Sequence, residues 1–132
     1  HPDITVMFAP YDEFAKGCKI AVDEAGLNKD VSIYSADIST ADIASMREAD
    51  SAWKATVATN PAVVGEVSVR ALAMLLAGED PGHNVVVPPT LITQAFLNEK
   101  NITNMEDLGK QMPQFAHADV AVPKWMPLPK RE

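Results

Sequence analysis

The sequence has few cysteine and few basic residues, and each shortage excludes a class of protein. One cysteine, Cys18, stands among 132 residues, so no disulfide can form within the chain and zinc motifs with paired cysteines are excluded. The 18 Asp and Glu residues outnumber the 11 Lys and Arg residues, which gives a net charge of −7. Because phosphate neutralisation needs clustered basic side chains, we expect no nucleic-acid partner.

Motifs of membrane insertion, catalysis and metal binding are also missing. No apolar run approaches the roughly 18 residues of a membrane-spanning helix. The six glycines are isolated, so no phosphate-binding loop is present. No serine stands in a nucleophile elbow, and the three histidines lack the spacing of metal ligands. We therefore expect a protein that is not an enzyme and needs no metal or cofactor, with an unrelated α/β enzyme kept as an alternative.

What the sequence does contain is 47% hydrophobic residues, arranged in alternating strand and helix patterns. Runs of β-branched and apolar residues predict strands at 4–9, 31–36 and 53–58, buried on both faces as in a parallel sheet. A helix pattern follows each strand, over residues 12–25, 39–50 and 60–77. This order predicts an α/β fold with a mainly parallel sheet.

Local signals predict where these helices begin and which faces they bury. Asp12 stands where an N-cap belongs, residues 39–42 ("STAD") resemble a capping box, and Asn60 precedes Pro61 at the first helical position. Helical spacing predicts the buried residues of the first and third helices, which are Phe14, Cys18, Ala21 or Val22, Ala25, Val64, Val67, Ala71 and Met74 or Leu75.

The remainder of the chain carries weaker patterns. Residues 83–97 read as extended segments broken by Pro88 and Pro89, because a proline pair is excluded from a central strand. Residues 104–112 ("NMEDLGKQM") predict a short helix, and the tail beyond them reads as a loop.

The three predicted strands end in polar residues. The first runs into Tyr11, the second into Asp37, and the third into Thr59 and Asn60. Ligands of open parallel sheets bind outside the carboxyl ends of the strands, and a carboxylate with phenol, hydroxyl and amide neighbours suits a neutral polyhydroxyl ligand better than a phosphate. Structural explanations stay open, since Asn60 can cap a helix, Asp37 can be a solvated loop acid, and Tyr11 can be a packing residue.

Three stretches match a known family in order and spacing: "HPDITVMFAPYDEFAKG", "VSIYSADIST" and "WKATVATNPAVVGEVSVRALAMLLAGE". They resemble the periplasmic sugar-binding proteins of the ribose-binding, type I class, and the resemblance covers most of residues 1–97. It implies a Rossmann-like lobe with a parallel sheet that binds a ligand rather than converting it.

The resemblance also implies which residues contact the ligand. In that family an Asn, an Asp and a Gln at three strand ends commonly contact sugar hydroxyls, and these positions match Tyr11, Asp37 and Thr59. Asp37 keeps the family's residue type, whereas Tyr11 and Thr59 replace amides and point away from ribose itself. We therefore expect another monosaccharide, a sugar alcohol or a related cyclic polyol, bound by Asp37, Tyr11, Thr59 and Asn60.

Proteins of this class have two lobes joined by a hinge that the chain crosses three times. The resemblance implies that this chain is an incomplete C-terminal portion of such a protein. Residues 1–61 would then be the last part of the second lobe, residues 62–84 a helix of the first lobe, residues 85–97 a hinge crossover with the last strand, and residues 98–132 a C-terminal extension. Because a partial lobe leaves strand edges open, we expect self-association.

The leading hypothesis is the solute-binding component of an ABC importer. The resemblance implies that it is located in the periplasm and delivers a small neutral polyhydroxyl ligand to a membrane permease. Two alternatives remain: the ligand-sensing core of a LacI-like transcriptional repressor, which shares the fold, and a binding protein for an autoinducer-type cyclic polyol.

Overall fold

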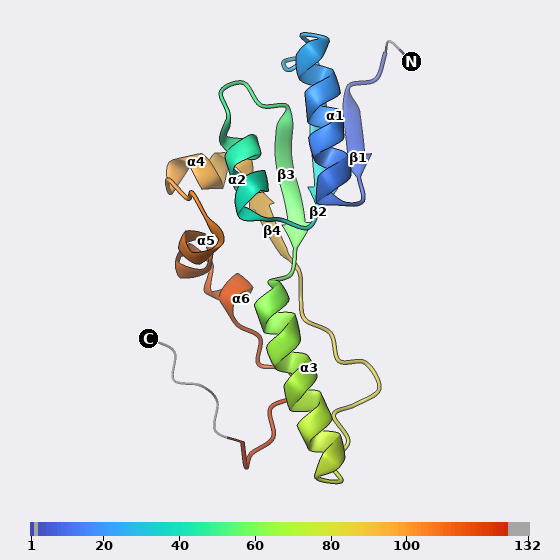
Figure 1. The fold of residues 1–132 in the computed structure, drawn as a ribbon, viewed down its shortest axis with the longest axis vertical. Helices are drawn as coiled ribbons and strands as arrows, with labels where there is room; N and C mark the ends of the chain where they lie inside the picture. The colour runs from blue at the N-terminus through green and yellow to red at the C-terminus, as the bar shows by residue number, and fades with distance from the viewer. Residues whose placement is uncertain (2, 127–132) are drawn as a thin grey trace.

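The computed structural model describes residues 1 and 3–126, and in this part of the chain four strands form one mixed sheet (Figure 1). The strands β1 (Val6–Ala9), β2 (Ser32–Ala36) and β3 (Trp53–Ala58) are parallel neighbours, and β4 (Thr90–Thr93) pairs antiparallel with β3. The predicted α/β fold with a mainly parallel sheet is confirmed.

Helices follow each strand. The helix α1 (Asp12–Glu24) follows β1, α2 (Thr40–Arg47) follows β2, and α3 (Pro61–Leu76) follows β3. After β4 come α4 (Gln94–Glu99), α5 (Met105–Gln111) and α6 (Pro113–Ala116). Figure 1 shows α1 and α2 against the sheet, whereas α3 runs away from it and gives the molecule its elongated shape.

Two of the predicted helix starts are confirmed and one is wrong. Ser39 and Asp42 form a complete capping box, and the Asn60 Oδ1 atom accepts a hydrogen bond of 3.0 Å from the backbone N–H of Ala62. The first helix is capped instead by Tyr11 in an extended conformation, so Asp12 is its first helical residue rather than its cap.

The predicted buried faces of α1 and α3 are partly wrong. In α1 the buried residues are Asp12, Ala15, Lys19 and Val22, whereas Phe14 is 61% exposed. In α3 they are Val63, Val67 and Arg70, whereas Val64 and Leu75 are exposed. Both helices bury charged side chains that find partners on other elements, which helical spacing cannot reveal. Residues 94–97, expected to be extended, lie in α4, and the tail expected to be a loop contains α6.

Two apolar clusters divide the described chain into what we call the sheet body, residues 3–58 and 90–116, and the α3 body, residues 61–87 and 118–126. The larger cluster lies in the sheet body and includes the fully buried side chains of Trp53, Ile33, Ile43, Met46, Ile92, Leu97, Ile102 and Leu108. The smaller cluster holds Val63, Val67 and Ala118, with Val85, Val87, Val120 and Ala121 partly buried against it. The chain passes between the bodies at residues 59–60, 88–89 and 117.

One face of the sheet is uncovered in the part of the chain that the structure describes. Phe8 and Tyr34 lie opposite each other on β1 and β2, and Val57 and Leu91 lie opposite each other on β3 and β4. Phe8 is 70% exposed and Leu91 is 59% exposed. We call this surface, made of Val6, Phe8, Tyr34, Val57 and Leu91, the open face; parallel sheets normally have both faces covered.

Candidate ligand-binding rim at the carboxyl ends of the strands

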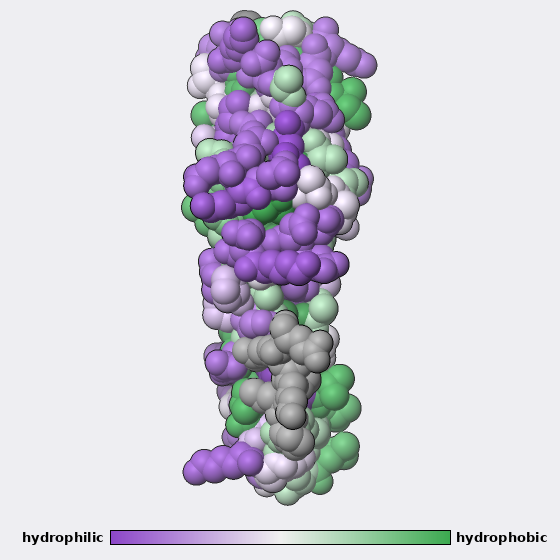
Figure 2. Space-filling view, turned by 90° about the vertical axis from the view of Figure 1, so that its left-hand side faces the viewer, coloured by the Kyte–Doolittle hydropathy of each residue, from purple (hydrophilic) through white to green (hydrophobic). Residues whose placement is uncertain are grey.

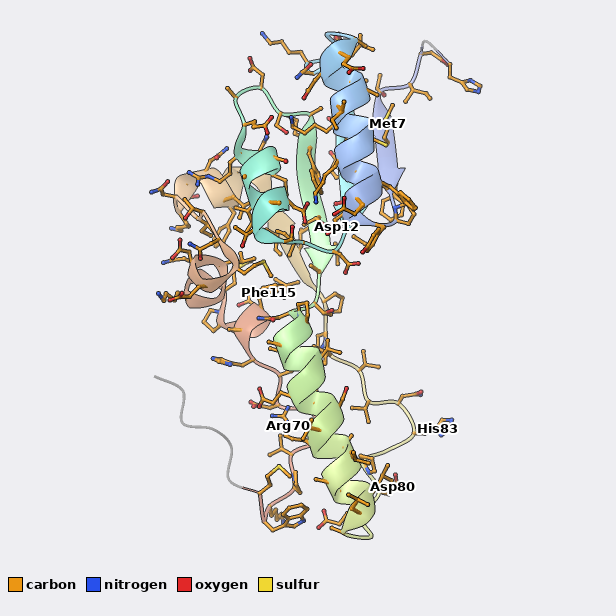
Figure 3. All side chains as sticks on the ribbon, viewed as in Figure 1. Met7, Asp12, Arg70, Asp80, His83 and Phe115 are labelled. Carbon is orange, nitrogen blue, oxygen red and sulfur yellow. The ribbon has the colours of Figure 1, made fainter. Side chains whose placement is uncertain are left out.

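The sequence-predicted site residues lie at the edge of the sheet where β1, β2 and β3 end and β4 begins, an edge we call the rim. Tyr11 lies two residues after β1, Asp37 follows β2 directly, and Thr59 and Asn60 follow β3. In Figure 3 the labelled Asp12 marks the rim end of α1, which faces toward the α3 body. The topology thus brings the strand ends to one edge.

Asp37 is held at the rim by backbone bonds. Its N–H donates a 3.0 Å hydrogen bond to the Val57 carbonyl, and its own carbonyl accepts a 2.7 Å bond from the Thr56 hydroxyl. Its backbone lies in the left-handed region, with φ of 68°. A positive φ is uncommon in non-glycine residues, and Asp and Asn adopt it more readily than the others.

The Asp37 carboxylate is exposed, and among residues 1 and 3–126 no hydrogen-bond or ion-pair partner is found for it. Thr56, which fixes the Asp37 backbone, is 1% exposed. Sequence reasoning missed Thr56, because a hydroxyl in a strand interior carries no local signal of such a bond. A carboxylate fixed by its backbone and free at its oxygens is suited to accept hydrogen bonds from a ligand.

Tyr11 lies beside Phe14 at the rim end of α1. The two rings meet edge to face with their centroids 6.0 Å apart, and the exposed fractions are 47% for Tyr11 and 61% for Phe14. An exposed aromatic pair at a strand end offers apolar surface for a ligand. Phe14 was expected in the core, so its position at the rim is a finding of the structure.

Thr59 and Asn60 line different hollows beside the connection between the two bodies. Thr59 borders a cavity of about 410 Å³ together with Val64, Val67 and Val86 of the α3 body. Asn60 borders another of about 400 Å³ together with Met105 and His117. The Asn60 side chain also caps α3, so one of its polar atoms is already engaged.

A partly buried cluster of charged residues lies between the N-terminal turns of α1 and α2. Asp42 is fully buried; its Oδ2 atom accepts a 2.6 Å bond from the Ser39 N–H, and its Oδ1 atom lies 3.0 Å from the Lys16 ammonium. Hydrogen bonds to Glu13 and Asp42 raise the pKa of Lys16 well above its ordinary range, so its charge persists. Burial, and then a hydrogen bond and charge repulsion from Asp42, raise the pKa of Asp12. The cluster joins the two helix starts that support Tyr11 and Asp37.

Metal binding and membrane insertion are the last two properties that bear on the kind of site. Within residues 1 and 3–126 no group of three or more His, Cys, Asp or Glu side chains is placed to hold a metal ion. No helix of the described chain has the length and apolar character needed to cross a bilayer.

Comparisons with known proteins identify the family of the chain. The chain is 33% identical over 94 residues to the ribose import binding protein RbsB of Bacillus subtilis (strain 168), an alignment that covers 71% of this chain and 30% of that protein. The structure matches the 5-methylthioribose transporter solute binding protein of Thermotoga lettingae TMO, crystallised with 5-methylthioribose, with a TM-score of 0.87 and 40% identity over 94% of this chain and 39% of that one.

A second solved structure, a sugar ABC transporter protein of Yersinia enterocolitica subsp. enterocolitica 8081, matches with a TM-score of 0.78 and 33% identity over 88% of this chain and 35% of that one. The chain therefore spans between 30% and 39% of the length of these relatives. The profile of the periplasmic binding protein domain family matches residues 1–80. The chain belongs to the periplasmic binding protein domain family.

Proposed function

We propose that the protein to which this chain belongs is the solute-binding component of an ABC importer, and that the rim supplies part of its sugar site. The observation that carries the proposal is Asp37, an exposed carboxylate fixed in a left-handed conformation at a strand end. Such a carboxylate accepts hydrogen bonds from two adjacent hydroxyls of one sugar. The matched relatives are transport proteins, which favours this function over a repressor core or an enzyme.

The ligand we propose is a monosaccharide or sugar alcohol that presents hydroxyls to Asp37 and an apolar portion to Tyr11. Thr59 and Asn60 would contact the same ligand from the connection between the bodies. The exposed Tyr11–Phe14 pair provides apolar surface at the rim. A pentose with an apolar substituent, such as the 5-methylthioribose bound by the Thermotoga lettingae protein, matches both features.

Isothermal titration calorimetry on the whole protein tests this site with ribose, 5-methylthioribose and a sugar alcohol. Asp37→Ala should weaken binding of the best ligand by about 1.5–3 kcal/mol, because a charge-assisted hydrogen bond is lost. Asp50→Ala is the matched control, since Asp50 also has a positive φ, of 57°, but precedes β3 at the opposite edge. Unchanged affinity in Asp37→Ala would show that the site lies elsewhere.

Tyr11→Asn tests the choice of ligand separately. It restores the amide that the resembling family has at this position and removes half of the aromatic pair. We expect it to shift preference from 5-methylthioribose toward ribose. An equal loss for both sugars would show that Tyr11 supports the rim without selecting the ligand.

The remaining partners follow from the same proposal. A solute-binding protein is expected to lie outside the cytoplasm and to deliver its ligand to a membrane permease. For residues 1–132 alone we propose self-association through the open sheet face and the β1 edge. Light scattering should show a concentration-dependent dimer, and Phe8→Lys should weaken it because Phe8 is 70% exposed on that face, on the edge strand β1. A monomer at every concentration would contradict self-association.

A further inference from the structure

We propose that residues 117–126 form a strap that limits the angle between the sheet body and the α3 body. The strap follows α6 and runs beside α3, the green helix in the lower half of Figure 1. In the described chain it adds a connection between the bodies to those at residues 59–60 and 88–89. A chain that is anchored on both bodies restricts their relative motion, as hinge-spanning segments do.

The strap begins from a firm anchor in the sheet body. Phe115 of α6 is 2% exposed and belongs to the larger core cluster, and Leu108 of α5 is fully buried in the same cluster. The backbone N–H of Met105 also lies 3.4 Å from the Thr40 hydroxyl of α2. In Figure 3 the labelled Phe115 lies at the junction of the two bodies. The first strap residue is therefore fixed close to the hinge.

The second anchor is on α3 and is built around Arg70. Ala118 is 9% exposed, and its carbonyl accepts a 2.7 Å hydrogen bond from Arg70 Nη2. Arg70 Nη1 donates a 2.6 Å hydrogen bond to Glu66 one turn earlier, and the whole side chain is 3% exposed. Within the described residues Arg70 Nε has no hydrogen-bond partner. A buried guanidinium needs every partner that it has, so Arg70 holds the Ala118 carbonyl tightly.

The strap makes further contacts with α3 and with the turn that follows it. Val120 and Ala121 pack against the cluster of Val63 and Val67, and the Trp125 indole N–H donates a hydrogen bond to the Glu79 carboxylate beyond the end of α3. The contacts of the strap therefore reach from α3 itself to a residue beyond its end.

The strap is separated from the connection at residues 88–89 by a hollow. A cavity of about 340 Å³ lies there, lined by Pro89 and Thr90 on one side and by His117 and Val120 on the other. The consequence for a ligand rests on the proposed function. A limit on the angle between the two bodies keeps the rim close to its ligand-binding geometry, and this reduces the free-energy cost of closing the bodies around the ligand.

Electron spin resonance distance measurements on the 132-residue chain test the strap without any ligand. Spin labels are attached at Ile20→Cys on α1 and Leu72→Cys on α3, both exposed positions, in a Cys18→Ala background. A chain that ends at Ala116 lacks the strap, and a chain that ends at Met126 is the matched control. We expect the first to show a broader distance distribution with longer distances, and the second to match the full chain. Equal distributions would overturn the proposal.

Arg70→Met provides a second variant in case the shortened chain loses α3. It keeps an apolar side chain of similar length but cannot hold the Ala118 carbonyl. We expect the same broadening in this variant, together with faster amide exchange in residues 118–122 and retained protection of α3. An unchanged distribution with faster exchange would refute the strap as a restraint. Sugar binding is not part of this measurement, so a failed strap leaves the proposed function standing, and absent sugar binding leaves the strap standing.

Discussion

The sheet body buries large side chains in one continuous core, whereas α3 leaves much of its apolar surface in contact with solvent. Trp53, Ile33 and Leu108 are fully buried in the sheet body. On α3 the exposed apolar residues are Val64, Val69, Leu72, Leu75 and Leu76, and Leu76 is 81% exposed. Figure 2 shows this surface as green patches along the right-hand edge of the lower half, below an upper half that is mostly hydrophilic.

The difference shows where stability resides. Burial of apolar surface is the main favourable term in folding. The core between the sheet and the helices that cover it therefore stabilises the sheet body. The α3 body has only three features that stabilise it: two extended segments that pack against α3, a few buried valines, and the hydrogen bond from Arg70 to the Ala118 carbonyl. An apolar helix that is this exposed is expected to pack against further protein in the whole molecule.

The two tryptophans give the largest test of the comparison. Trp53 is fully buried, and its indole N–H donates a 2.9 Å hydrogen bond to the Ser35 hydroxyl. Trp53→Ala should lower the free energy of unfolding by about 3–5 kcal/mol, as large cavities do. Trp125 is 50% exposed in the α3 body, so Trp125→Ala should change the free energy of unfolding by about 0.5 kcal/mol at most. Urea unfolding followed by circular dichroism measures both, and equal losses would contradict the division.

Helix caps give a test of intermediate size. Ser39→Ala removes the capping box of α2, and Asn60→Ala removes the cap of α3; each should cost about 1 kcal/mol. We expect Ser39→Ala to lower the urea midpoint of the whole chain. Asn60→Ala should instead mainly speed amide exchange in α3, because local opening there does not require the sheet body to unfold. A global loss of stability in Asn60→Ala would show that the two bodies unfold together.

Two aspartates with positive φ compare the opposite edges of the sheet body. Glycine adopts a positive φ without strain, so Asp37→Gly and Asp50→Gly should each stabilise the folded chain. The greater freedom of glycine in the unfolded chain offsets this gain. Each variant should therefore leave the free energy of unfolding unchanged or raise it by up to about 1 kcal/mol. In the whole protein, Asp37→Gly should weaken sugar binding to the same extent as Asp37→Ala, and Asp50→Gly should preserve it. Calorimetry and urea unfolding on the same variants check both parts; loss of binding in both would point to a general distortion.

Local features of the sequence predicted the framework well. The Ser39 capping box, the Asn60-Pro61 helix start and the three parallel strands involve residues that are neighbours in sequence, so their signals are visible without the fold. The positions of Tyr11, Asp37 and Thr59 at one edge follow from the same alternation, because parallel strands share an edge. Their contacts with a ligand remain predictions.

Contacts between distant residues explain what the sequence did not predict. Helix α1 buries Lys19 because Asp23 and the distant Glu48 neutralise it, and it buries Asp12 beside Asp42 of α2. Residues 94–99 are helical because Thr93 caps them and the Gln94 amide donates to the carbonyls of Met46 and Ser51. The buried Arg70 likewise depends on a carbonyl 48 residues away. Glu48, Asp42, Met46, Ser51 and Ala118 are far in sequence from the residues that they contact, so no local pattern reveals these partners.

Asp12 provides the smallest and most specific test, because it concerns a single proton in the sheet body. Burial and the neighbouring Asp42 raise the pKa of Asp12 above its value of 3.8 in an unfolded chain. A group whose pKa is raised on folding stabilises the fold fully below its unfolded pKa and loses that contribution as pH rises through its folded pKa. Asp12→Asn carries no such proton, so its stability relative to the native chain should rise as pH increases from about 4 toward neutrality.

Urea midpoints of the native chain and Asp12→Asn, measured at steps of pH across this range, check the direction. Lys16→Met is the opposing variant, because the Lys16 charge lowers the pKa of Asp12 and its removal should enlarge the pH dependence. Lys16→Met also leaves the fully buried Asp42 without its cation, so it should be less stable than the native chain at neutral pH. A constant difference between Asp12→Asn and the native chain at every pH would mean that Asp12 titrates alike in the folded and unfolded states. The two helix starts beneath the rim would then be joined by packing and the Lys16–Asp42 ion pair, without a shared proton.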